Sequence, residues 1–138
     1  MAFEQTLTTS FKQEVLLGVH DLATDTLKMA LYEAEANLTA STTVYGTANE
    51  VVGSGYVAGG NVLTGVTVQT SGTTAFVDFA DSVWNPASFT ARGALIYNAS
   101  KGNKSIAVLD FGSDKTATTS FTVQMPPNTA TAALIRFA

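Results

Sequence analysis

The sequence predicts a mainly β fold, either an antiparallel β-sandwich or a jelly-roll-like barrel, with one short helix near the N-terminus. About seven or eight runs of strand length are separated by turn signals roughly every 8–12 residues. The chain contains 11 glycines and only 13% charged residues, a composition typical of many strands and turns. No helical pattern lies between the later strands, which excludes parallel βαβ units.

A chain of 138 residues predicts a single domain with its own hydrophobic core. We divide it into an N-terminal arm, residues 1–9, and one β-sandwich domain, residues 10–138. The arm has no clear hydrophobic period, yet it carries Phe3 and Leu7. It must therefore cover apolar surface, either on its own sandwich or on a neighbouring subunit.

The sheet is expected to be organised around one hairpin, built from residues 91–97 and 106–111 with a polar turn at residues 98–105. Ile106 begins a run of four consecutive apolar residues without polar alternation. Such a run is typical of a strand that is covered on both faces. We therefore place this hairpin at the centre of the sandwich.

One short helix is predicted over residues 11–17. Ser10 is its expected N-cap, and Gln13 completes a capping-box pattern three residues later. Gly18 is its expected C-terminal stop. Four apolar side chains recur at helical spacing and predict one buried stripe: Phe11, Val15, Leu16 and Val19.

The remaining strands follow from alternating or β-branched runs between turn signals. Trp84, the single tryptophan, precedes Asn85 and Pro86 and is interpreted as a packing residue. The glycine-rich residues 53–60 indicate a sharply bent loop anchored by Tyr56. The predicted strands are residues 27–32, 62–69, 75–80, 120–125 and 132–137.

Composition and charge exclude several classes of function. The net charge of −4 and seven scattered basic residues argue against binding nucleic acid through its phosphates. The absence of cysteine excludes disulfides and thiolate metal sites. We recognise no signal peptide and no apolar run of the roughly 20 residues that a membrane helix needs, so we expect no membrane partner and assembly in the cytoplasm. A surface with so few charges favours coverage by a partner over a fully solvated sheet.

The residues do not assemble into a catalytic or cofactor site, so we expect neither an enzyme nor a cofactor or small-molecule substrate. His20 is the single histidine, and no G-x-S-x-G pattern exists to complete a triad with it. Asp78 and Asp81 lie on opposite faces of a strand and cannot flank one glycosidic bond. The glycine-rich loop lacks the lysine of a phosphate-binding loop. Calcium binding at residues 21–25 or 78–81 matches no known loop pattern.

The chain resembles a family of small virion proteins encoded by tailed bacteriophages. The resemblance covers residues 10–138 and lies in the order and spacing of several segments. These are FKQEVLLGVHDL (11–22), DTLKMALY (25–32), EVVGSGYVAGG (50–60), VWN (83–85), TARGALIYN (90–98), IAVLDFG (106–112) and ALIRF (133–137).

The resemblance implies a virion structural protein, and we expect a head decoration (cement) protein located on the capsid surface. Its expected partners are the major capsid protein and further copies of itself. A tail or neck (head–tail connector) component and a carbohydrate-binding adhesion module remain as alternatives. The arm, the glycine-rich loop and the C-terminal strand are the segments expected to contact partners by strand addition or packing. The candidate interface residues are Phe3, Leu7, Tyr56, Arg136 and Phe137.

Overall fold

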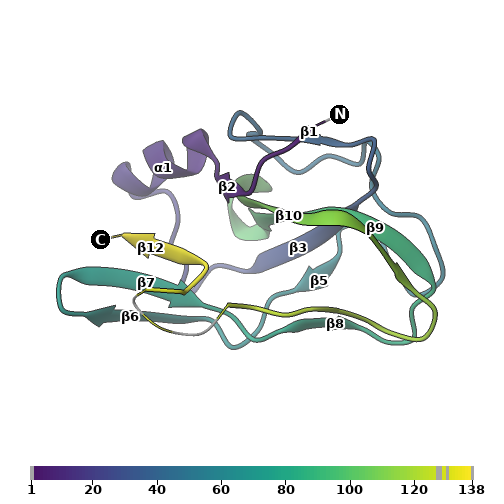
Figure 1. Ribbon diagram of the computed structural model, residues 1–138. Helices are drawn as coiled ribbons and strands as arrows, with labels where there is room; N and C mark the ends of the chain where they lie inside the picture. Colours follow the sequence, from purple (N-terminus) through teal and green to yellow (C-terminus); the bar gives the residue numbers. More distant parts are fainter. Residues whose placement is uncertain (1, 127–128, 130, 138) are drawn as a thin grey trace.

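The computed structural model describes residues 2–126, 129 and 131–137. Within these residues the chain is mainly β, with antiparallel sheets packed together and one short helix near the N-terminus (Figure 1). The predicted fold class is confirmed. Of the two architectures considered, the described strands form an open sandwich, and no closed barrel is found among them.

The central layer is a five-stranded antiparallel sheet in the order β2-β10-β9-β3-β5. The predicted hairpin forms its middle, as expected, although both strands are longer than predicted and a short 3-10 helix, η1 (Ala99–Lys101), lies in the turn. The strands are β2 (Thr6–Leu7), β10 (Lys104–Ala117), β9 (Phe89–Asn98), β3 (Leu27–Tyr32) and β5 (Asn61–Val62).

Two small antiparallel sheets pack against one face of this central sheet. The first has the order β12-β7-β6, from β12 (Ile135–Phe137), β7 (Thr74–Asp78) and β6 (Thr67–Ser71). The second pairs β11 (Phe121–Val123) with β8 (Ser82–Trp84). The main core lies between the layers and includes Trp84, which is buried as predicted.

The opposite face of the central sheet is covered by irregular chain instead of a second sheet. β1 (Ala2–Phe3) runs parallel to β4 (Asn37–Leu38), and the chain from Ala36 to Tyr45 continues across this face. A second apolar cluster forms underneath. Because both faces are covered, β9 and β10 carry continuous buried runs rather than an alternating pattern, which confirms the interpretation of the run that begins at Ile106.

The helix differs from its prediction in its N-cap and in its buried stripe. α1 spans Thr9–Leu16, and its N-cap is Thr8, whose Oγ1 accepts a hydrogen bond from the Phe11 amide at 3.3 Å. Ser10, the predicted N-cap, lies inside the helix, where its hydroxyl contacts that of Ser105. The chain enters the helix earlier because Thr8 is already fixed by the pairing of β2 with β10.

One predicted strand is in fact two. Residues 62–69 divide into β5 and β6, because the chain leaves the central sheet at Leu63 and crosses to the second layer. The Leu63 amide still bonds to the Leu27 carbonyl, whereas the Thr64 carbonyl accepts from the Ala80 amide. Gly65, at a φ of +62°, allows this change of direction. The predicted strand at residues 132–137 is likewise confined to β12.

Candidate interaction surface

The most distinctive surface lies where α1 ends. Leu16 is 87% exposed and Leu17 is 70% exposed, although Phe11 one turn earlier is completely buried. At 3.6 residues per turn, Phe11 and Val15 share the face that packs on the core, and the two leucines project away from it. The prediction that Leu16 belongs to the buried stripe is therefore wrong.

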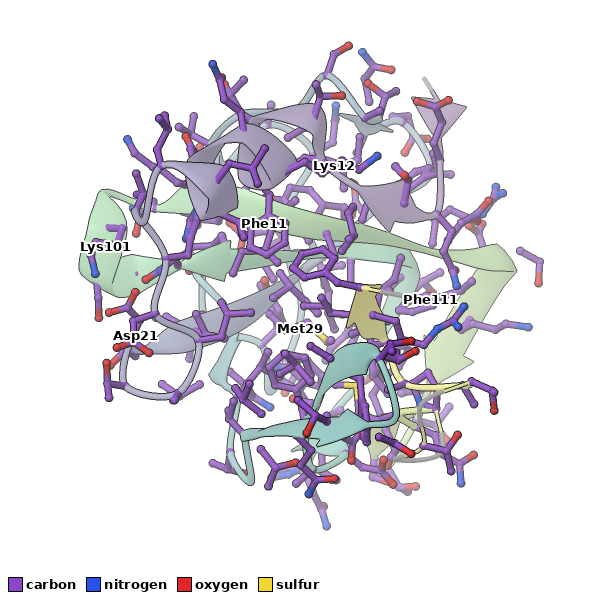
Figure 2. All side chains as sticks on the ribbon, turned by 90° about the vertical axis from the view of Figure 1, so that its left-hand side faces the viewer. Phe11, Lys12, Asp21, Met29, Lys101 and Phe111 are labelled. Atoms are coloured by element: carbon purple, nitrogen blue, oxygen red, sulfur yellow. The ribbon has the colours of Figure 1, made fainter. Side chains whose placement is uncertain are left out.

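A groove of about 460 Å³ lies beside this helix end, between α1 and the three-stranded sheet. Figure 1 shows α1, the end of β12 and the β6–β7 hairpin on the same side of the molecule, and Figure 2 looks onto that side. The side chains on one face of the three-stranded sheet form its floor, because Val77 is in register with Val68 on β6 and Ile135 on β12.

The lining of the groove is mainly apolar. Val15 and Leu22 come from α1 and the loop after it, and Phe137 comes from the end of the last strand. Phe137 is 43% exposed, so its ring is free to contact a partner over part of its surface. Together with Leu16 and Leu17, this groove is called the helix-end surface below.

A network of polar side chains supports the loop that borders the groove. The His20 side chain is fully buried, its Nε2 lies 2.8 Å from Glu14 Oε1, and its ring packs on Phe11. Its Nδ1 lies 3.0 Å from Asn98 Nδ2, which also donates to Asp25 at 2.8 Å. His20 is thus a loop-packing residue that fixes the loop between α1 and β3 against the end of the central hairpin.

Asp25 is the charged centre of this network. Its carboxylate accepts from Asn98 and from Lys101, whose Nζ lies 2.9 Å from Oδ1. Burial alone raises the pKa of Asp25, but these two donors outweigh it and lower the pKa to about 2. Asp25 belongs to residues 21–25, the segment that matches no known calcium-loop pattern, and its carboxylate is paired with Lys101.

Phe3 and Leu7 lie in the body of the molecule and not on a free arm. Phe3 pairs with Leu38 in the parallel β1–β4 ladder, and its ring packs on Gly93, where an added Cβ would lie 2.5 Å from the ring. Leu7 pairs with Ala107 of β10 and packs against the main core. From Ala2 onward, the predicted arm covers its own sandwich. This is one of the two alternatives that the sequence left open.

Tyr56 is an internal anchor rather than an exposed contact. Its hydroxyl donates to the Glu50 carboxylate and accepts from the Leu31 amide, so the glycine-rich loop is tied to β3. Glu50 is buried and also accepts from the Tyr45 hydroxyl at 2.7 Å and the Gly59 amide at 2.8 Å. The predicted anchoring role is confirmed, and Tyr56 is half-buried where a contact residue would be exposed.

The structure separates the five candidate interface residues. Phe137 reaches the helix-end surface, and Arg136, the residue before it, is exposed on the opposite face of β12. Leu16 and Leu17 were missed because helical periodicity assigned Leu16 to the core. The available signal was the angle around the helix: at 3.6 residues per turn, Val15 lies about 40° from Phe11, whereas Leu16 and Leu17 lie roughly 140° and 120° away from it.

Neither metal clusters nor membrane helices are found in the part of the chain that the structure describes. No group of three or more His, Cys, Asp or Glu side chains there is arranged to hold a metal ion. No helix among these residues is long and apolar enough to cross a bilayer. Comparisons with protein-family models, with curated proteins and with solved structures find no match to this chain.

Proposed function

We propose that this chain is a structural protein of a tailed-bacteriophage virion that decorates the head and bridges major capsid subunits. The helix-end surface is the observation that carries the proposal. Leu16, Leu17 and Phe137 present apolar area to solvent beside a mainly apolar groove, and such a surface is typical of a site that a protein partner covers. The sequence resemblance supplies the class of partner.

The rest of the molecule fits a binding role that depends on rigidity. The central sheet is buried on both faces, and the described chain ends are paired into sheets. A preorganised body loses little conformational entropy when it binds, so the buried area is converted into affinity efficiently. The low charged fraction of 13% agrees with a surface that is partly covered in its assembled state.

The aromatic side chains do not favour the carbohydrate-binding alternative. A sugar platform needs exposed aromatic rings, but Trp84, Tyr32 and Tyr97 are buried. Tyr45 stacks on Tyr97 with ring centroids 4.6 Å apart, and Tyr56 packs against Trp84. Binding in a glycan-array screen would count for adhesion and against capsid decoration.

Binding of the purified full chain to phage heads that lack it tests the proposal. We expect saturable binding at a copy number that follows the capsid subunits, and Leu17→Lys should abolish it while the circular dichroism spectrum stays unchanged. Val52→Lys is the matched control, because Val52 is also highly exposed but lies outside the helix-end surface and outside the glycine-rich loop. A ring-sized copy number at the neck or tail, or equal effects of both substitutions, would contradict the proposal.

A further inference from the structure

The outer strand of the three-stranded sheet has an unprotected edge. β6 is the last strand in the order β12-β7-β6, and all five of its residues are exposed. Within the described chain, no hydrogen bond is recorded to β6 other than its pairing with β7. Alternate residues of an edge strand direct their N–H and C=O groups outward, so β6 offers a row of free backbone donors and acceptors.

The usual protections of an edge strand are missing here. Native sheets guard their edges with short strands, charged side chains, proline or bulges. The edges of the central sheet, β2 and β5, have only two residues each, and β12 carries Arg136. In contrast, β6 has five residues, and the sequence from residue 63 to residue 77 contains neither a charged residue nor a proline. The β6 edge is therefore free to pair with another strand.

We propose that β6 pairs antiparallel with β6 of a second copy of this chain, with Gln69 of both copies on the twofold axis. Gln69 is the central residue of the strand, so this register pairs all five residues. It places Val68 of each copy opposite Thr70 of the other, a β-branched pair suited to neighbouring strands. The two sheets join into one six-stranded sheet, and the twofold axis closes the assembly because each copy uses its only β6 edge.

The register is the reason that the occupant is a second copy, because β6 pairs antiparallel with an identical strand over its whole length and opposes no charged residues. The chain carries a net charge of −4, so two copies repel each other over most orientations. The uncharged β6 edge is where they can meet without opposing like charges. Strand exchange by the ends of the chain is not needed, since β1, β2 and β12 are already paired within their own subunit.

The dimer has a consequence for binding. A twofold axis perpendicular to a joined sheet turns the same face of both halves in one direction. Val68 lies on the groove side of its sheet, so both helix-end surfaces would face the same way. Two identical sites on one rigid body bind a repetitive surface with avidity. The self-pairing itself does not rest on the proposed virion role.

Sedimentation velocity on the purified full chain over a range of concentrations tests the pairing. We expect a monomer–dimer equilibrium that Thr70→Lys shifts to monomer. A charged lysine on an edge strand disfavours strand pairing, and the two introduced lysines would repel each other across the twofold axis. Thr118→Lys makes the same change at an exposed threonine outside the strands and should leave the dimer intact.

A cysteine cross-link fixes the register. The chain has no cysteine, so Gln69→Cys introduces a single thiol on the proposed axis. We expect a disulfide-linked dimer on mild oxidation, and none when Thr70→Lys is added. A chain that remains monomeric at every concentration, a dimer that Thr70→Lys leaves unchanged, or cross-linking that persists in the double variant would overturn the proposal.

Discussion

Glu50 is the residue around which all four tyrosines of the chain gather. It accepts hydrogen bonds from Tyr45 and Tyr56, while Tyr97 stacks on Tyr45 and donates to the Gly59 carbonyl at 2.6 Å. Burial, followed by the negative charge of Glu50, raises the pKa of every tyrosine hydroxyl in the chain. The pKa of Tyr97 is about 12 and those of the others are higher still.

This cluster predicts an unusual alkaline titration. The native chain should show no phenolate absorbance near pH 10, whereas the urea-unfolded chain should titrate all four tyrosines at about pH 10. Because the folded pKa values lie above the unfolded ones, the stabilisation is complete below about pH 10 and is lost as the pH rises toward 12 and beyond. Tyr97→Phe should remove the first native step. A native phenolate step near pH 10 would contradict the buried cluster.

Asp25 predicts the opposite behaviour in acid. Its folded pKa of about 2 lies below the ordinary value of 3.8, so its contribution to stability is present above about pH 4 and is lost as the pH falls through 2. Lys101→Met should lower the free energy of unfolding at pH 6 by about 0.5 kcal/mol, a small effect because the lysine is 37% exposed. It should also move the acid loss to higher pH.

Urea unfolding at pH 6 and at pH 2.5 measures both effects of Lys101→Met. Lys115→Met is a suitable control, since Lys115 is an exposed lysine of β10. Equal pH profiles for the two variants would show that Lys101 does not hold the pKa of Asp25 down.

Among the elements, α1 depends on a cap that is also a core residue. Thr8 is fully buried, and its Oγ1 accepts from the Phe11 amide and from the Ser105 hydroxyl. Thr8→Ala should therefore lower the free energy of unfolding by about 1–2 kcal/mol, and Thr8→Ser should recover most of it. Ser10→Ala should cost only about 0.5 kcal/mol. Chemical denaturation compares the three, and a larger effect at Ser10 would restore it as the N-cap.

The outcome at α1 shows what local pattern could and could not predict. The helix itself and the central hairpin follow from periodicity and turn chemistry, and the structure confirms them. The N-cap and the break at Leu63 depend on pairings with β10 and β3, which lie far away in the sequence. A pattern that describes one segment carries no information about those partners.

The candidate surface was only partly predictable for a related reason. Phe137 could be singled out as an apolar residue near the chain end, and the structure leaves it partly exposed. Leu16 and Leu17 differ from core leucines only in their angular position around a short helix. The packing of Phe11 in the main core fixes the orientation of that helix and therefore which side chains are exposed. The groove is lined by residues of α1 and β12, which lie at opposite ends of the chain. It forms only when the tertiary fold places these elements side by side, so no local sequence pattern predicts it.

At the scale of the whole molecule, the described chain ends are part of the rigid body. Near the N-terminus β1 pairs with β4 and β2 pairs with β10, and β12 completes the three-stranded sheet (Figure 1). Partners must therefore approach a preformed surface. Deleting a terminal segment should lower the free energy of unfolding, and any loss of binding should follow from that loss of stability.

Removal of residues 2–7 tests this integration. Phe3 and Leu7 are half-buried, and their segment supplies both pairings, so the deletion should lower the free energy of unfolding by at least about 2 kcal/mol. Leu7→Ala should cost about 1 kcal/mol, whereas Leu17→Ala, at an exposed leucine, should stay within about 0.5 kcal/mol. Thermal and urea unfolding measure all three. If the deletion leaves stability unchanged, the segment is an arm after all, and its contribution to capsid binding must then be measured directly.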